Sequence, residues 1–205
     1  MTEGVASAWR PSRGSRARLC VLMATLVANF GLCLAGANAQ QNTVPAAPRE
    51  PASVADFQPK RYLGRWHEIG RLPNRFQKEC VAYVTADYAP LEDGDIRVTN
   101  RCQKADGSFI VAEGRARQPE PALARLRVSF LPEWLRWVPF TEADYWVLAL
   151  SADYQYALVG TPGRDYLWVL SRTPALPREV TQALLLQAAA MGYPADQVQM
   201  TRQVP

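Results

Sequence analysis

The residues with chemically reactive side chains are few and scattered. The sequence contains one histidine, His67, and four cysteines. A zinc site needs several Cys or His ligands at short spacings, which one histidine does not supply. Glu68 lies beside it, and a buried carboxylate is more often a hydrogen-bonded structural group than a catalyst. The chain also lacks a Gly-x-Ser-x-Gly elbow and a glycine-rich phosphate loop. We therefore expect no enzyme, no metal site and no cofactor.

The N-terminal segment has the layout of a secretory leader. Arginines precede an apolar run over residues 19–35, and Ala37-Asn38-Ala39 then forms a small-x-small cleavage pattern. We predict a cleaved signal peptide over residues 1–39. One alternative is an uncleaved anchor, for which the apolar run is short against about 30 Å of hydrocarbon. The other is a lipoprotein leader acylated at Cys33, for which Leu32 is too large a preceding residue.

Removing this leader changes the charge and the cysteine count. The formal net charge of the whole chain is +4. Most of it resides in the leader arginines, so the basic pI is no argument for nucleic acid as a partner. Cys80 and Cys102 remain, and in an oxidising compartment we expect them to form a disulfide. It closes a loop of about 23 residues, worth roughly 3 kcal/mol by chain entropy. Two buried free thiols are the alternative.

The rest of the chain reads as short strands separated by turns. Residues 40–54 are rich in Pro and Ala and are predicted to be a disordered lead-in, followed by one domain over 55–205. Alternation is clearest over 123–130, where Leu126 and Val128 alternate with arginines. The predicted strands cover 62–71, 81–88, 96–102, 109–116, 123–130, 144–150, 154–159 and 166–171.

One helix is predicted late in the chain. Pro177 suits its first turn, apolar residues recur at helical spacing to Met191, and Gly192 with Pro194 ends it. Residues 194–200 offer a ninth strand. Eight meandering strands favour an up-and-down barrel, although a β-sandwich has strands of similar length.

Three motifs resemble those of the lipocalin family. Gly64-Arg65-Trp66 is similar to its Gly-x-Trp signature, and Asp153-Tyr154 to its second signature. The block from Leu167 to Pro174, which contains Arg172, looks like the third. The resemblance spans about residues 55–200 and is greatest to bacterial outer-membrane lipocalins and apolipoprotein D. It implies an eight-stranded up-and-down antiparallel β-barrel, the lipocalin calyx, with a C-terminal α-helix packed outside.

The resemblance also implies a structural latch at the closed end. Trp66 plugs the base of the barrel and Arg172 lies across its indole, a cation–π contact worth about 0.5–2 kcal/mol. Gly64 is expected to allow close backbone approach beneath the indole. We therefore expect these three residues to be structural.

Alternation along each strand predicts which residues meet a ligand. Several inward positions carry small side chains, so the barrel is not expected to fill itself. Apolar walls then favour an apolar or amphiphilic ligand. The predicted ligand-binding residues are Val84, Ala86, Tyr88, Val98, Ala112, Val128, Phe130, Tyr145, Trp168 and Leu170.

The loops at the open mouth combine aromatic and cationic residues. Residues 131–142 hold Trp134, Trp137 and Phe140, and the loop after the first strand holds Arg71, Arg75 and Lys78. This rim suits an anionic head at the lip, a membrane surface or a second copy of the chain; aromatics packed against the barrel are the alternative.

These features together predict a carrier of a fatty acid or lysophospholipid-like ligand in the periplasm, with attachment to the outer membrane as an option. Two other functions remain open. A few lipocalins use a cavity cysteine as a nucleophile on lipid peroxides, and a barrel with a filled interior would instead be a partner-binding stress protein.

Overall fold

The computed structural model describes residues 49–203, apart from 136–137 and 139–140. The predicted signal peptide and residues 40–48 of the predicted lead-in lie outside this range. Within it, no helix has the length and apolar character needed to cross a membrane.

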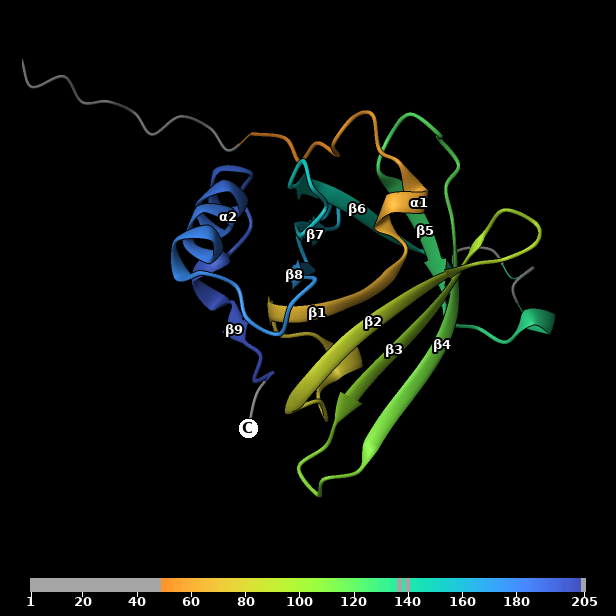
Figure 1. The fold of residues 1–205 in the computed structure, drawn as a ribbon, viewed down its shortest axis with the longest axis horizontal. Coiled ribbons are helices and arrows are strands. Elements are labelled where there is room, and N and C mark those ends of the chain that lie inside the picture. Colours follow the sequence, from red (N-terminus) through yellow and green to blue (C-terminus); the bar gives the residue numbers. More distant parts are fainter. Residues whose placement is uncertain (1–48, 136–137, 139–140, 204–205) are drawn as a thin grey trace, which may run out of the picture. The chain divides into compact units, whose positions relative to one another are not determined.

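Eight antiparallel strands close into a barrel, as predicted (Figure 1). Consecutive strands pair from β2 to β8, β8 pairs with β1, and β1 pairs with β2 to complete the circle. The strands are β1 (Gly64–Arg71), β2 (Ala82–Pro90), β3 (Ile96–Gln103), β4 (Phe109–Arg117), β5 (Arg125–Ser129), β6 (Ala143–Leu150), β7 (Tyr156–Gly160) and β8 (Leu167–Ser171).

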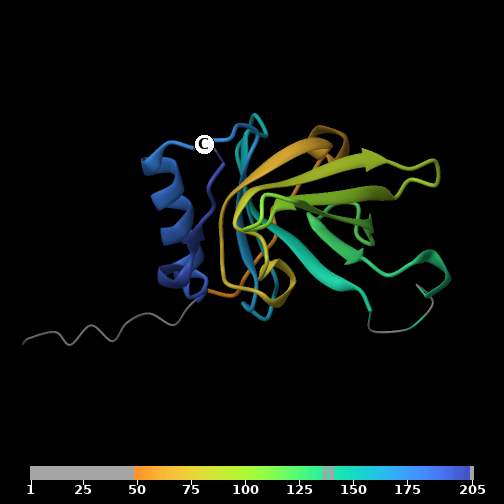
Figure 2. The same ribbon diagram turned by 90° about the horizontal axis from the view of Figure 1, so that it is seen from below.

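The barrel has one apolar layer inside it and a second outside it. The inner cluster surrounds Trp66 and includes Val98, Leu126 and Val128. The outer cluster lies between the barrel wall and α2 (Arg178–Ala190), which contributes Leu184 and Ala188. Figure 2 shows α2 standing beside the barrel rather than over either end. The predicted outer helix is therefore confirmed, and its apolar stripe explains why it packs there.

The C-terminal segment completes the barrel wall. A short strand, β9 (Gln199–Met200), pairs with the C-terminal end of β1, beyond the residues of β1 that pair with β2. Beyond it, Arg202 bridges to Ala82 at the start of β2, and its carbonyl accepts a hydrogen bond from the Tyr83 amide at 2.8 Å. The predicted ninth strand therefore exists but is shorter, because a 3₁₀ turn, η3 (Ala195–Gln197), occupies its first half.

Other boundaries differ from the predicted ones for local reasons. A one-turn helix, α1 (Pro59–Tyr62), precedes β1 and was not predicted. Strand β7 begins after Tyr154 because that residue has φ of 63°, which is not extended backbone. Residues of the predicted lead-in contact the domain: the Arg49 amide bonds the Ala190 carbonyl at 2.9 Å, and the Val54 amide bonds the Val147 carbonyl at 2.9 Å. The lead-in and domain boundaries stay a prediction.

Candidate ligand-binding site

The closed end of the barrel is a packed aromatic plug. Trp66 is fully buried, and its indole Nε1 donates to the carbonyl oxygen of Tyr62 at 2.8 Å. The two rings lie 4.7 Å apart between centroids. Tyr62 was not predicted as part of the site, because its contact with Trp66 depends on the turn between α1 and β1 and not on a regular spacing within one element.

Arg172 latches this plug from outside. Its guanidinium carbon lies 3.9 Å from the centre of the Trp66 ring. Its Nη1 and Nη2 donate to the carbonyls of Arg65 at 2.9 Å and Arg61 at 2.8 Å. The side chain thereby ties β8 to the entry of β1. Glycine is needed at position 64 for a different reason from the predicted close approach to the indole. Its φ is +93°, a backbone conformation that other residues rarely adopt.

The strand register places the predicted ligand-binding residues on the inner face of the barrel. Trp66 pairs with Ala86, which pairs with Asn100, which pairs with Ala112, so these four residues share one face. Their burial falls into three groups. Val84, Tyr88, Val98, Val128 and Leu170 are buried, Ala86, Tyr145 and Trp168 are partly buried, and Ala112 and Phe130 are exposed.

Phe130 lies against Gly114 on this inner face. A Cβ built on Gly114 would meet the Phe130 ring at 2.8 Å, so the glycine leaves room for the aromatic side chain. Phe130 nevertheless remains 45% exposed. Its ring therefore covers the strand backbone without closing the interior above it.

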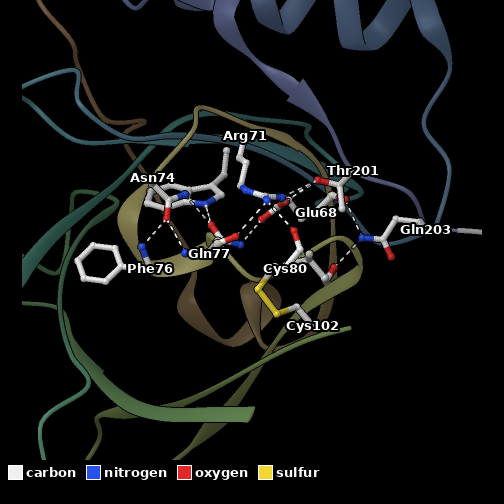
Figure 3. Close-up of a disulfide and its surroundings, with 11 residues drawn as sticks. Glu68, Arg71, Asn74, Phe76, Gln77, Cys80, Cys102, Thr201 and Gln203 are labelled. Atoms are coloured by element: carbon white, nitrogen blue, oxygen red, sulfur yellow. Dashed lines mark hydrogen bonds and ion pairs between the residues drawn. A yellow bond between two sulfur atoms is a disulfide. The ribbon is translucent and has the colours of Figure 1, made fainter. Parts of the chain in front are cut away.

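A buried polar cluster occupies the inner side of β1. The sequence predicted a hydrogen-bonded structural role for Glu68 but not the partners that the structure gives it. Glu68 Oε1 accepts from Arg71 Nη1 at 2.6 Å and from the hydroxyl of Thr201 at 2.5 Å. Glu68 Oε2 accepts from Gln77 Nε2 at 2.6 Å. Figure 3 shows these side chains converging beside the disulfide. We call Glu68, Arg71, Gln77 and Thr201 the polar cluster.

The sequence analysis placed Arg71 among the cationic residues at the mouth, and this prediction is wrong. The register between β1 and β8 shifts between Glu68 and Gly70, and this bulge turns Arg71 to the same side as Trp168. Arg71 is only 9% exposed and is neutralised by Glu68. Its Nη2 also donates to the Cys80 carbonyl at 3.0 Å.

The polar cluster and the disulfide together hold the loop between β1 and β2 against the barrel wall. Cys80 in this loop is bonded to Cys102 of β3, with Cα atoms 5.4 Å apart. Gln77 belongs to the loop's 3₁₀ turn, η1 (Arg75–Gln77), and accepts a hydrogen bond from Trp168 Nε1 at 2.9 Å. The loop is thus tied to β3 by the predicted disulfide, which is present, and to β8 by a hydrogen bond.

Aromatic side chains at the mouth point outward. Phe76 is 65% exposed and Trp134, in the 3₁₀ turn η2 (Glu133–Leu135), is 72% exposed. Figure 3 shows the Phe76 ring directed away from the polar cluster. Arg75 and Lys78 are exposed beside Phe76. Trp137 and Phe140 lie outside the described residues.

Three further features of the described residues bear on the site. It contains no group of three His, Cys, Asp or Glu side chains that could hold a metal. His67 points away from Trp66, and burial lowers the pKa of its imidazole. A groove of ≈ 540 Å³ lies outside the barrel between α2 and β6, lined by residues such as Leu150, Val180 and Leu184.

Sequence comparison supports the same family as the fold. A family model described as a lipocalin-like domain matches residues 57–203. The outer membrane lipoprotein Blc of Escherichia coli K12 is 41% identical over 151 residues, which cover 73% of this chain and 81% of that protein. Temperature-induced lipocalin-1 of Arabidopsis thaliana is 37% identical over 157 residues, or 76% and 84% of the two chains.

Comparison with an animal protein and with solved structures agrees. Rat apolipoprotein D is 35% identical over 175 residues, covering 80% of this chain and 83% of the relative. Insecticyanin from the tobacco hornworm Manduca sexta superposes with a TM-score of 0.61 at 20% identity, over 78% of this chain and 88% of that chain, a likeness of fold. With the barrel, the Trp66 plug and the Arg172 latch in place, the chain belongs to the lipocalin family, whose members bind small hydrophobic ligands.

Proposed function

We propose that this protein binds and carries a fatty acid, a lysophospholipid or a similar amphiphile inside its barrel. The observation that carries the proposal is the exposure of Ala112 and Phe130. Both lie on the inner face by register, yet solvent reaches them. An interior that admits water beside apolar walls can bury an acyl chain, at roughly 25 cal/mol per Å² of apolar surface.

A matched pair of substitutions on β4 tests this proposal. Ala112→Trp places a large side chain inside the barrel, whereas Val111→Trp places it on the outer face, where Val111 is 56% exposed. Displacement of a fluorescent fatty acid should show at least a tenfold weaker affinity for Ala112→Trp and an unchanged affinity for Val111→Trp. No binding by the unmodified protein would favour the filled barrel of a partner-binding protein. Equal affinity for all three proteins would place the ligand elsewhere.

We further propose that the protein catalyses no reaction on its ligand. The alternative of a cysteine nucleophile requires a free thiol, because the thiolate is the reactive form. Both cysteines of the described chain are consumed by the Cys80–Cys102 disulfide. Thiol titration of the native, unreduced protein should detect no free thiol from these two positions. Detection of two reactive thiols would instead support the alternative of a cysteine-dependent enzyme.

The cell envelope is the proposed location. The relatives named outer membrane lipoprotein and the leader-like N-terminus support export to the periplasm, with attachment to the outer membrane as the finer alternative. The exposed Phe76 and Trp134 beside Arg75 and Lys78 suit contact with an anionic membrane surface. Native mass spectrometry of the exported protein should give the mass of a chain whose first residue is Gln40. The mass of a chain that starts at an acylated Cys33 would show a lipid anchor. A mass twice that of one chain would show a homodimer.

A further inference from the structure

Three tyrosine hydroxyls meet inside the barrel beside Trp66. They come from α1 (Tyr62), β2 (Tyr88) and β6 (Tyr145). The Tyr62 and Tyr145 hydroxyl oxygens lie 2.8 Å apart, and the Tyr88 hydroxyl donates to that of Tyr145 at 2.9 Å. Tyr62 and Tyr88 are buried, whereas Tyr145 keeps partial exposure. Tyr145 is therefore the one member of this tyrosine cluster whose side chain keeps accessible surface.

Counting hydrogens shows that the cluster has one donor left over. Three phenols carry three hydroxyl hydrogens, and the two contacts among them use two. No further acceptor for these hydroxyls occurs among the residues that the structure describes. Tyr88 donates to Tyr145, so the spare hydrogen belongs to Tyr145 or to Tyr62. A buried donor without an acceptor is costly, which favours placing it on the partly exposed Tyr145.

The surroundings make this donor attractive to an anion. Arg172 lies beneath the Trp66 ring and donates hydrogen bonds to three carbonyl oxygens. No carboxylate pairs with it among the described residues. Its charge opposes the rise that burial causes in the pKa of Tyr88, which still reaches about 12. Burial also raises the pKa of Tyr62 and Tyr145. The three phenols therefore stay protonated as neutral donors, and the positive charge of Arg172 acts on Tyr62 and Tyr88.

Arg71, which lies on the inner side of β1, is already paired. Arg71 is paired with Glu68 at 2.6 Å and donates to the Cys80 carbonyl. A ligand carboxylate near this pair would meet the negative charge of Glu68 as well as the positive charge of Arg71. The balance of charge therefore favours the tyrosine cluster over the polar cluster as the place for an anionic group.

We propose that a fatty acid binds carboxylate first, with a carboxylate oxygen accepting a hydrogen bond from the Tyr145 hydroxyl. The inference rests on the proposed function and deepens it by assigning an orientation and a ligand class. It replaces the head-at-the-lip arrangement that the cationic loops suggested from sequence. The acyl chain then lies along the apolar inner wall with its methyl end toward the mouth.

Carbon-13 NMR of bound palmitate tests the orientation in the unmodified protein. Palmitate labelled at the carboxyl carbon or at the terminal methyl carbon is bound in turn, and a soluble gadolinium chelate is added. We expect stronger line broadening of the methyl carbon than of the carboxyl carbon. Stronger broadening of the carboxyl carbon would overturn the inference while leaving the proposed function intact. Failure of palmitate to bind at all would overturn both.

Two phenylalanine variants test the residue. Tyr145→Phe removes the proposed donor, whereas Tyr156→Phe makes the same change on the outer face, beside α2. We expect Tyr145→Phe to weaken palmitate binding about tenfold, as for loss of one hydrogen bond to a charged group. The resonance of the bound carboxyl carbon should also shift, with neither change in Tyr156→Phe. An unshifted carboxyl resonance in Tyr145→Phe would overturn the assignment. If this variant fails to fold, the labelled-palmitate experiment still decides the orientation.

Discussion

Aromatic side chains are buried at the closed end of the barrel and exposed at its open end. At the closed end Trp66 is completely buried, hydrogen-bonded and covered by Arg172. At the open end Trp134 is 72% exposed and Phe76 is 65% exposed. An aromatic residue stabilises a fold through the area it buries, so the closed end contributes stability. The exposed aromatics of the open end contribute little, which leaves them free to contact a ligand or a surface.

Replacing one tryptophan at each end should give the largest contrast. Trp66→Ala removes a fully buried indole and should lower the free energy of unfolding by about 3–5 kcal/mol. Trp134→Ala should change it by less than about 0.5 kcal/mol. Urea unfolding of the two variants measures both values. Similar losses at the two ends would mean that Trp134 is packed in solution and that the contrast is wrong.

The disulfide is the main covalent restraint near the open end. Substituting both Cys80 and Cys102 by Ser should lower the free energy of unfolding by roughly 3 kcal/mol, because the bond restricts the unfolded chain. Each single substitution should cost about as much as the pair, since either one removes the bond. Guanidinium unfolding under non-reducing conditions provides the comparison. Additive losses from the two single variants would show that the side chains matter apart from the bond.

The closed end could be predicted from sequence because its signals are local. Gly64 and Trp66 lie in one short motif, and Arg172 directly follows β8 within a second motif. Period-two alternation also placed Ala112 and Val128 on the inner face, in agreement with the register. The inner-face assignments needed only the pleat of a strand, which every residue in it shares, whereas the latch came from the resemblance of its motifs to those of lipocalins.

The region toward the open end could not be predicted because it depends on irregular and distant contacts. The bulge after Glu68 reverses the alternation, so counting from Trp66 leaves Arg71 on the wrong face. Tyr83 has φ of 51°, and its amide bonds Arg202 from the far end of the chain. The Glu68–Thr201 contact likewise joins residues far apart in sequence. No local pattern carries such pairings.

A matched arginine pair at the closed end should give a smaller effect. Arg172→Lys keeps the charge but loses the planar fork that reaches two carbonyls while covering Trp66. We expect a loss of about 1–2 kcal/mol in the free energy of unfolding. Arg65→Lys changes an exposed ion pair with Asp87 and should cost less than about 1 kcal/mol. Thermal unfolding of both variants ranks them, and an equal loss would argue against a latch.

The smallest effect is expected on the outer wall between the two ends, at His67. Burial lowers the pKa of this imidazole in the folded protein, so the unfolded chain takes up the proton first as the pH falls. Stability from the neutral imidazole is therefore present above the unfolded-state pKa of about 6.5 and is lost as the pH falls toward the lower folded-state value. His67→Gln removes this titration. Urea unfolding at pH 8 and pH 5 should show a larger decrease for the unmodified protein than for the variant, and equal decreases would mean that solvent reaches the imidazole freely in the folded state.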